Sequence, residues 1–417
     1  MNSAIMDRDT FDKSRADQLN VALIHPFDPR GGKVGGIETF VRDYITYHPD
    51  DMNLLLIGVD GFGDLELGKV TQISFRGRTI SFFPVMKLPE TETNVYARKL
   101  SDAVTMRFTL ACLRNYFALR SILRKGGYSI DLRRIELAPL GAAFGVPSVQ
   151  MLHDGMVKGK QMSSLLKRFW WIKDLSERFS LSRAYSFYCV NDDLSARLKT
   201  TYPQHAEKIG TLPTWANPQI FKTTPIPPLI DDALHVGYTG RMDDFKRPDI
   251  MFQVIAQARR MCPGLVFHYV GDGDVERFSE FDAIRDCTVL HGRQDTEGLA
   301  AILAKLHVGL LTSDFEGMPR SVMEFLASGR PVVALHLPQL EAVIHDERSG
   351  YLVPRGPDQI VRMAERLCDM RERIAQGAVT TEQVADAVAD YSPARLLGRL
   401  YSDHRKLQAA RRQLARA

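Results

Sequence analysis

The segment Asp314-Phe-Glu-Gly-Met-Pro-Arg-Ser-Val-Met-Glu324 says more about the fold than any other stretch of this sequence. It follows a short apolar run at 308–311 that is typical of a buried parallel strand. Pro319 indicates a helix start, so the pattern predicts Glu316 in a loop and Glu324 in the helix. The segment is therefore a strand, a loop and a helix, the unit from which parallel α/β sheets are built.

Two carboxylates flanking a helix start suit a nucleotide sugar. Eight helical positions span about 12 Å, which approximates the distance from the sugar across the diphosphate to the ribose. Each carboxylate can accept two hydroxyl hydrogen bonds. Between them, the N–H groups of Gly317, Met318 and Arg320 are expected to point from the helix start at an anion.

A pair of candidate cations follows the strand expected at 234–238. That strand leads into Gly240-Arg241, and Lys246 comes five residues later. The two cations can clamp a diphosphate, because arginine binds it through two parallel N–H bonds. Taken alone, they are more simply two exposed basic residues beside Asp243-Asp244, and these adjacent acids are more simply solvated than metal-binding.

A glycine-rich loop, Gly31-Gly-Lys-Val-Gly35-Gly36, follows the first expected strand and opens a helix. Glycines let backbone N–H groups approach an anion closely, so Gly35 and Gly36 are candidate phosphate contacts. The spacing matches neither GxxxxGK[ST] nor GxGxxG, which argues against a P-loop and a dinucleotide fingerprint. A flexible turn is the alternative interpretation.

The composition is that of a soluble globular protein. Hydrophobic residues make up 45% and charged residues 25% of 417 positions, which excludes a disordered chain, a fibrous repeat and a membrane bundle. A net charge of +4 is too small to indicate a nucleic-acid binder. The five cysteines form no CxxC pair, which argues against a zinc site and fits reduced thiols. No signal peptide or spanning segment is present, so we expect a cytoplasmic protein.

Short apolar runs alternate with amphipathic stretches throughout, as in βα units around parallel sheets. In the first half, strands are expected at 20–26, 53–59, 79–85, 148–153 and 185–190, and helices at 37–48, 98–125 and 193–202. In the second half, strands are expected at 234–238, 265–270, 288–290, 308–311 and 331–335, with a helix at 249–261 preceded by Pro248.

These elements predict an α/β protein of two Rossmann-like, doubly wound domains that face each other across a cleft. The expected boundaries are an N-terminal acceptor domain at 1–216, a proline-containing linker at 217–233 and a nucleotide-sugar domain at 234–390. A helical tail at 391–417 can return to the first domain. Because ligands bind at the carboxyl ends of strands in such sheets, the cleft is the expected site.

The second half resembles the retaining glycosyltransferases of family 4 (glycosyl transferases group 1), which have the GT-B fold. The resemblance rests on Gly240-Arg241-x4-Lys246, Val270-Gly271-Asp-Gly273 and Glu316-x7-Glu324, and it extends through 325–334, Glu341 and 349–354. Looser landmarks in the first half are Gly35-Gly36-Ile-Glu38, His153-Asp154 and 211–217. The similarity covers roughly residues 20–370.

This resemblance implies roles for individual residues. Arg241 and Lys246 would bind the donor diphosphate, Glu324 the ribose, and Glu316 and His153 would lie near the transferred sugar. Without the resemblance, His153 would be interpreted as an ordinary strand-end histidine. The remaining donor contacts would be Gly35, Gly36, Gly271, Gly317, Met318, Pro319 and Arg320, of which Arg320 could alter the sugar preference. Neither a metal nor a cofactor is expected, because protein cations stabilise the departing diphosphate.

We therefore expect a retaining, metal-independent hexosyltransferase that uses a nucleotide-diphosphate sugar and a glycan or lipid-linked acceptor in cell-envelope polysaccharide synthesis. Among enzymes, the alternative is a GT-B epimerase or phosphorylase, although we find no convincing pyridoxal lysine site. From another class, the alternative is a non-catalytic sugar-binding subunit. A dehydrogenase is excluded by the missing GxGxxG fingerprint.

Positive charge is concentrated in one part of the chain. Residues 69–200 carry 22 basic against 10 acidic residues, and 98–134 alone carry nine against two. Four further bases precede Phe169-Trp170-Trp171. Bases beside interfacial aromatics are typical of binding to an anionic bilayer, so residues 98–171 are expected to contact the inner face of the membrane. The alternative is that the bases solvate helix faces while the tryptophans pack in the core.

Overall fold

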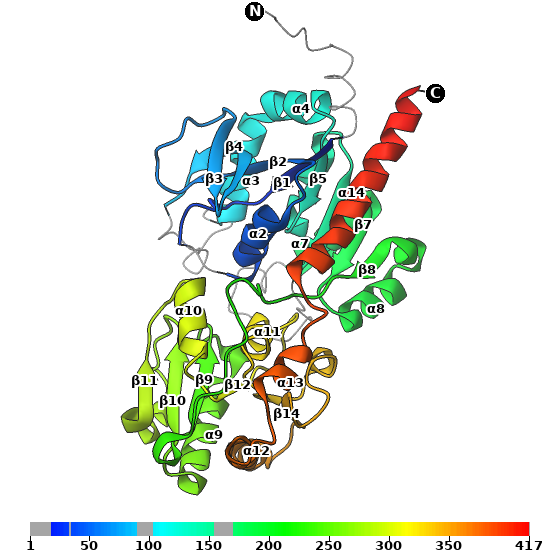
Figure 1. The fold of residues 1–417 in the computed structure, drawn as a ribbon. Helices are drawn as coiled ribbons and strands as arrows, with labels where there is room; N and C mark the ends of the chain where they lie inside the picture. The colour runs from blue at the N-terminus through cyan, green and yellow to red at the C-terminus, as the bar shows by residue number, and fades with distance from the viewer. Residues whose placement is uncertain (1–17, 33–34, 90–102, 154–169, 417) are drawn as a thin grey trace, which may run out of the picture.

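The computed structural model describes residues 18–32, 35–89, 103–153 and 170–416, which form two α/β domains, each around its own sheet (Figure 1). The first sheet has the strand order β3-β4-β2-β1-β5-β6-β7-β8 and the second β11-β10-β9-β12-β13-β14. All neighbouring strands are parallel except β3 and β4, which form an antiparallel hairpin. The α/β, doubly wound fold predicted from the sequence is confirmed.

The strand order reverses at β1 in the first sheet and at β9 in the second. The first sheet comprises β1 (Leu19–Ile24), β2 (Met52–Asp60), β3 (Thr71–Phe75), β4 (Arg78–Lys87), β5 (Ser129–Leu132), β6 (Ser148–Leu152), β7 (Ala184–Cys189) and β8 (Ile209–Thr211). The second comprises β9 (His235–Thr239), β10 (Val266–Val270), β11 (Thr288–Leu290), β12 (Val308–Leu311), β13 (Val332–Leu335) and β14 (Gly350–Val353). Such reversal points open a crevice at the carboxyl ends of the strands, where ligands bind.

Helices cover the faces of both sheets. Those of the first domain are α2 (Gly36–Tyr47), α3 (Val104–Arg114), α4 (Tyr116–Lys125), α5 (Ala138–Ala143), α7 (Trp170–Arg183) and α8 (Asp192–Thr201). Those that follow are α9 (Pro248–Met261), α10 (Thr296–Leu303), α11 (Arg320–Ala327), α12 (Gln359–Ala375), α13 (Thr381–Asp386) and α14 (Pro393–Arg416). Two apolar clusters pack on the first sheet and one on the second.

Every strand expected from the sequence is present, and four others were missed: β3, β5, β8 and β14. These four strands are short, and β5 carries the polar residues Ser129 and Asp131. In the structure all four residues of β5 are buried, and Asp131 pairs with Arg133 at 2.5 Å. A buried ion pair can thus hide a core strand from hydrophobic patterning.

The single helix expected at 98–125 is wrong, because the described part consists of two helices, α3 and α4. The chain breaks at Asn115, whose φ and ψ of −97° and 14° are not helical. The Asn115 side chain donates Nδ2 to the carbonyl of Ala111, one turn earlier. Asparagine competes in this way with backbone hydrogen bonding, which explains the break. Residues 98–102 of the expected helix lie outside the described residues.

The structure differs from the linker expected at 217–233, because this segment packs on the second domain. Phe221 is buried in the apolar core of the second domain, and Leu229 packs against this core. The guanidinium of Arg330 holds the segment by donating to the carbonyls of Thr224 and Pro225. Prolines remove periodicity from a sequence without exposing the chain, so the pattern was misleading here.

The chain crosses between the domains twice. At the first crossing, Trp215 is buried in the core of the first domain, and the next residue, Ala216, is buried in the core of the second domain. At the second crossing the chain enters α14, which lies along the first domain (Figure 1). Leu400 and Tyr401 of α14 are buried in the first core. Within the described part of the chain, no helix is long and apolar enough to cross a membrane.

Candidate active site

Two loops of the second domain are joined beside the carboxyl ends of β9 and β12. Phe245 stacks on Phe315, with ring centroids 4.8 Å apart. The N–H of Asp314 donates to the carbonyl of Phe245 at 2.7 Å, and the hydroxyl of Thr312 donates to the carbonyl of Lys246 at 2.8 Å. These contacts hold the loop after β9 against the loop before α11, which brings Lys246 to Glu316.

Lys246 and Glu316 form an ion pair at the junction of these loops, with Nζ and Oε1 2.8 Å apart. Each side chain is only 15% exposed, and the hydroxyl of Ser313 donates to the same carboxylate oxygen at 2.9 Å. Burial alone would lower the pKa of Lys246, but the neighbouring Glu316 outweighs it and raises the pKa. Lys246 is therefore a fixed positive charge.

Glu316 lies in the loop and Glu324 in α11, as the sequence predicts. Glu324 is almost fully buried, and Arg320, one turn earlier, donates Nε to its Oε1 at 3.1 Å. Burial raises the pKa of Glu324 to about 7, although Arg320 acts in the opposite direction. Near neutral pH this carboxyl group can therefore be either protonated or ionised.

Arg320 contacts carboxylates of both domains. Its Nη2 donates to Oδ2 of Asp43 in α2 at 2.8 Å, while Nε holds Glu324. The remaining nitrogen, Nη1, is buried without a hydrogen-bond partner among the described residues. No local sequence pattern indicates that Asp43 is a partner of Arg320, because the two residues are 277 positions apart.

The start of α11 presents backbone donors that have no partner in the described part of the chain. Pro319 is its N-cap, and its carbonyl accepts from Val322 at 3.1 Å, so the helix begins directly after it. Among the described residues, no acceptor is recorded for the N–H groups of Gly317, Met318 and Arg320. A helix N-terminus with free N–H groups favours an anion. The Met318 side chain packs against the apolar core of the second domain.

Arg241 and Gly271 lie at the ends of neighbouring strands. Arg241 is mostly exposed and pairs with Asp243 at 2.8 Å, whereas Asp244 pairs with Arg277. The two acids interpreted from the sequence as solvated therefore each have an arginine partner. A Cβ at Gly271 would lie 2.2 Å from the carbonyl oxygen of Gly240, so close packing of two strand ends already requires a glycine there.

The first domain contributes the start of α2. Gly35 is its N-cap in extended conformation, and a Cβ there would lie 2.3 Å from the carboxylate of Glu38. Gly36 has open space around the position of a Cβ. His25, directly after β1, lies 3.7 Å from Glu38. Burial would raise the pKa of Glu38, but His25 and Arg134 outweigh it and lower the pKa, so Glu38 is ionised.

His153 lies directly after β6 and contacts α2 through its ring. The ring meets Phe40 edge-on, with centroids 5.2 Å apart. Burial lowers the pKa of His153 well below its usual range, and Arg133 nearby lowers it further, so the imidazole is neutral. Its Nε2 is buried with no hydrogen-bond partner among the described residues. The neighbouring Asp154 lies outside the described residues.

Direct contacts join the two halves of the site. Besides the pair of Asp43 and Arg320, Asn191 before α8 donates to the carbonyl of Gly317. Across the same interface, Arg293 donates to the carbonyl of Gly32 at 3.5 Å. The loop before α11 and the start of α11 in the second domain thus meet α2 and the start of α8 in the first domain.

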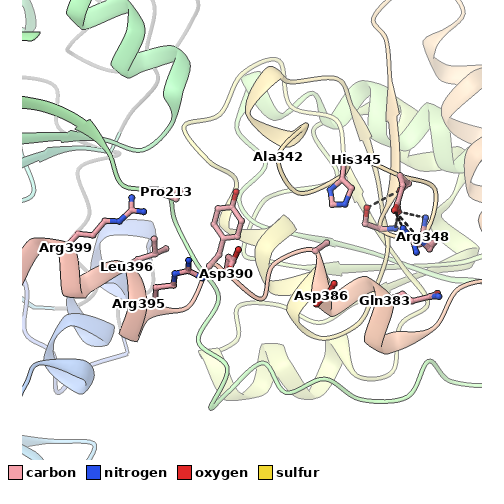
Figure 2. Close-up of a pocket in the computed structure, with 14 residues that line it drawn as sticks. Pro213, Ala342, His345, Arg348, Gln383, Asp386, Asp390, Arg395, Leu396 and Arg399 are labelled. Atoms are coloured by element: carbon pink, nitrogen blue, oxygen red, sulfur yellow. Dashed lines mark hydrogen bonds and ion pairs between the residues drawn. The ribbon is translucent and has the colours of Figure 1, made fainter.

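A separate cavity of about 520 Å³ lies between the domains and contains none of the predicted site residues (Figure 2). Its walls include Pro213 near the first crossing, and Asp390 and Arg395 at the second. His345 and Arg348 line it from the second domain. No group of three or more metal-ligating side chains occurs in the described part of the chain.

Sequence reasoning missed several residues of this site. His25, Asp43 and Asn191 contact site residues, yet none of them belongs to a motif singled out in the sequence. His25 had one available signal, because it follows the strand at which the first sheet reverses. Asp43 and Asn191 had none, since their partners lie in the other domain.

The match to a known protein family falls in the second domain. Residues 233–370 match the family described as Glycosyl transferases group 1. The alpha-D-kanosaminyltransferase of Streptomyces kanamyceticus is 24% identical over 253 residues, covering 56% of this chain and 65% of that protein. The resemblance to glycosyl transferases group 1 is confirmed. The alignments with the first two curated relatives span 65% and 38% of their lengths.

Solved structures agree with the fold over nearly the whole chain. Sucrose-phosphate synthase from Thermosynechococcus elongatus has a TM-score of 0.70 at 18% identity, covering 94% of this chain and 100% of that one. The pneumococcal O-GlcNAc transferase GtfA, solved with UDP and GlcNAc, has a TM-score of 0.61 at 12% identity, with 94% and 99% covered. The two domains therefore adopt the GT-B arrangement.

Proposed function

We propose that this chain of GT-B fold, whose second domain matches glycosyl transferases group 1, is a retaining glycosyltransferase. It moves a hexose from a nucleotide-diphosphate sugar to a glycan or lipid-linked acceptor of cell-envelope polysaccharide synthesis. The observation that carries the proposal is the buried pair of Lys246 and Glu316 near the start of α11, whose first N–H groups have no acceptor among the described residues. A fixed cation and aligned dipoles are what a departing diphosphate requires.

The donor would lie across the second domain with its parts assigned to separate groups. Glu324 would accept hydrogen bonds from the ribose hydroxyls, and Lys246 with Arg241 would bind the diphosphate. Glu316 and the neutral His153 would contact the hexose, His153 through the unpartnered Nε2. Gly35 and Gly36 would cover the phosphates from the first domain, where the start of α2 adds its positive dipole end.

The transfer would proceed on one face of the sugar. The bond between the anomeric carbon and the diphosphate oxygen breaks, and its electron pair stays on that oxygen. The acceptor hydroxyl attacks the same face, forms the new glycosidic bond and passes its proton to a phosphate oxygen. Positive charge from Lys246 and Arg241 stabilises the departing diphosphate, so we propose that no metal ion is needed.

Release of nucleotide diphosphate tests the proposal. UDP-, GDP- and ADP-hexoses are each incubated with the protein, with and without a lipid-linked glycan fraction, and the diphosphate released is measured. Acceptor-dependent release from one donor class is expected. Conversion of the nucleotide sugar to an epimer without net release of diphosphate would favour an epimerase, and formation of hexose 1-phosphate from a glycan and inorganic phosphate would favour a phosphorylase. Binding of sugar without turnover of any donor would leave the non-catalytic sugar-binding subunit.

We further propose that the first domain contacts an anionic membrane surface. Apolar side chains at one-turn spacing are exposed on α3 and α4: Met106, Leu110, Leu113 and Phe117, the last 83% exposed. Exposed bases lie among them: Arg114, Arg124 and Lys125. An apolar stripe flanked by bases is the arrangement of a helix that lies on an anionic bilayer.

Two details refine this surface. Trp171, at the start of α7, is 62% exposed, so the alternative that both tryptophans of the aromatic run pack in the core is wrong for this residue. Arg133, counted in the basic region from the sequence, is fully buried against Asp131 and belongs to the interior. Residues 98–102 and 154–169, with six of the bases counted there, lie outside the described residues.

A further inference from the structure

Asp43 is the point at which both domains and the first chain crossing meet. It lies in α2 and is 1% exposed. Its two oxygens accept from Trp215 Nε1 and Asn217 Nδ2, each at 2.8 Å, and from Arg320 Nη2 at 2.8 Å. Trp215 and Asn217 flank the crossing, whereas Arg320 belongs to α11 of the second domain. One buried carboxylate therefore binds the crossing and the opposite domain together.

The partner of Asp43 leads directly to the donor site. Arg320 uses Nη2 for Asp43 and Nε for Glu324, so one guanidinium bridges a carboxylate of each domain. Both ends are shielded, with side-chain exposures of 13% for Arg320 and 1% for Asp43. The other interdomain ion pair of the described chain, between Arg76 and Glu297, is 25% and 60% exposed. Solvent weakens such an exposed pair, whereas the shielded pair is screened little.

The segments where the chain crosses between the domains also border a cavity. Pro213, two residues before Trp215, lines the cavity of about 520 Å³ together with Asp390 and Arg395 of the second crossing (Figure 2). Both crossings thus border this cavity. Rotation of one domain against the other can change this volume without disrupting a packed core.

We propose that Asp43 and Arg320 form an interdomain latch that holds the domains closed and positions Glu324 for the ribose of the donor. Both are positioning residues, because they act through Glu324 and through the placement of α2. The inference rests on the proposed function, which assigns the ribose to Glu324. It adds to that function a way of linking donor binding to domain closure.

In the latch, one guanidinium group donates hydrogen bonds to two carboxylates. In the closed form Arg320 is shared, and Glu324 keeps acceptor capacity for hydroxyl groups. When the domains separate, Asp43 keeps its hydrogen bonds from Trp215 and Asn217. Arg320 then remains hydrogen-bonded only to Glu324. The guanidinium then competes with the ribose for the Glu324 oxygens. Opening therefore weakens donor binding, and α2, which begins at Gly36 and carries Asp43, moves away from the phosphates at the same time.

Binding of UDP, GDP and ADP to the full-length protein, measured by calorimetry from pH 5.5 to 8.5, tests the latch. Asp43→Asn and Arg320→Gln should each weaken the best-bound nucleotide about tenfold. Their pH midpoints should move in opposite directions, because Asp43 raises and Arg320 lowers the pKa of Glu324. Asp43→Asn should move the midpoint down and Arg320→Gln should move it up. Loss of a merely structural contact would not produce this split.

Controls keep the outcomes distinct. Glu297→Gln breaks the exposed interdomain pair and should leave affinity and midpoint unchanged within twofold. Arg320→Gln leaves Asp43 bonded to Trp215 and Asn217, so it reports even if Asp43→Asn fails to fold. Wild-type affinity and an unmoved midpoint in Arg320→Gln would overturn the latch while leaving the proposed function intact. Failure of all three nucleotides to bind the wild-type protein would overturn both.

Discussion

At the scale of single residues, the site consists of opposite charges that satisfy each other before any ligand arrives. Lys246 holds Glu316, and Arg320 holds Glu324 and Asp43. Buried charges must be paired, because an isolated ion in the interior is costly. The proposed function would have the diphosphate bind Lys246 beside Glu316, so that the lysine has an anionic partner with and without the donor.

The contribution of the two cations can be separated by mutation. Lys246→Ala should lower kcat about 100-fold, because a buried donor aimed at the departing charge acts mainly in the transition state. Arg241→Ala should lower kcat about tenfold, since Arg241 is 59% exposed and solvent screens its charge. Steady-state kinetics with a saturating acceptor measures both. Arg277→Ala, which removes another arginine paired with an aspartate, should leave kcat unchanged; wild-type turnover in Lys246→Ala would contradict the diphosphate assignment.

The raised pKa of Glu324 predicts a pH-dependent stability. Because its folded pKa of about 7 exceeds the usual 4.5, the folded state binds the proton more tightly than the unfolded state. This stabilisation is complete below about pH 4.5 and is lost as the pH rises through 7. Glu324→Gln cannot ionise, so at pH 8 it should be more stable than the wild type by about 1–3 kcal/mol.

Urea unfolding of Glu324→Gln and the wild type at pH 5.5 and pH 8 measures this difference. The gain should shrink at the lower pH, where the wild-type carboxyl group is largely protonated. A variant that is equally destabilised at both values would show that burial does not raise the pKa of Glu324 as described.

At the scale of elements, the helices α3 and α4 each have a buried inner face and an exposed outer face. Their inner faces pack on the first sheet through Phe108 and Leu119, whereas their outer faces leave apolar side chains in solvent. Exposed apolar side chains at one-turn spacing are the basis for the proposal that this surface contacts a membrane. The break at Asn115 places Phe117 just after the stripe on α3.

Vesicle sedimentation tests this surface. The protein should bind vesicles that contain anionic lipid and should be released by about 0.5 M salt, where the Debye length falls to roughly 4 Å. Leu110→Ser combined with Phe117→Ser should weaken binding several-fold, because two apolar side chains leave the interface. Val361→Ser, which changes an exposed apolar residue of α12 in the second domain, should have no effect. Equal binding to neutral and anionic vesicles, indifferent to salt, would contradict the proposal.

At the scale of the whole molecule, the site exists only where two domains meet. Lys246, Glu316 and Glu324 belong to the second domain, whereas Gly35, Gly36 and His153 belong to the first. The helix α14 ties the ends together, since the chain returns to the first domain and buries His404 against Asp131 of β5. Closure of a two-domain cleft excludes water and strengthens every charge interaction inside it.

Transfer should survive saturating chelator, because protein cations supply the positive charge for the diphosphate. Activity is measured with the preferred nucleotide sugar before and after dialysis against EDTA, and again after addition of Mg²⁺ or Mn²⁺. Rates within about twofold are expected throughout. Loss of transfer in EDTA with recovery on adding a divalent metal would show that Asp243-Asp244 or another acid pair has a role that we did not assign.

The sequence by itself determined five of the six strands in the second sheet and the local setting of its motifs. Glu316 in a loop, Glu324 in a helix and Pro248 at the start of α9 all follow from signals within a few residues. Local signals suffice here because caps, prolines and apolar periodicity act over one or two turns.

Only the tertiary structure decided which of these residues meet. The pair of Asp43 and Arg320 spans 277 positions, and the buried pair of Arg133 and Asp131 turned an expected surface base into a core residue. The segment 217–233 looked like a linker because its prolines break periodicity, yet it packs on the second core. Burial and ion pairing depend on what the rest of the chain places nearby, and no local pattern carries that information.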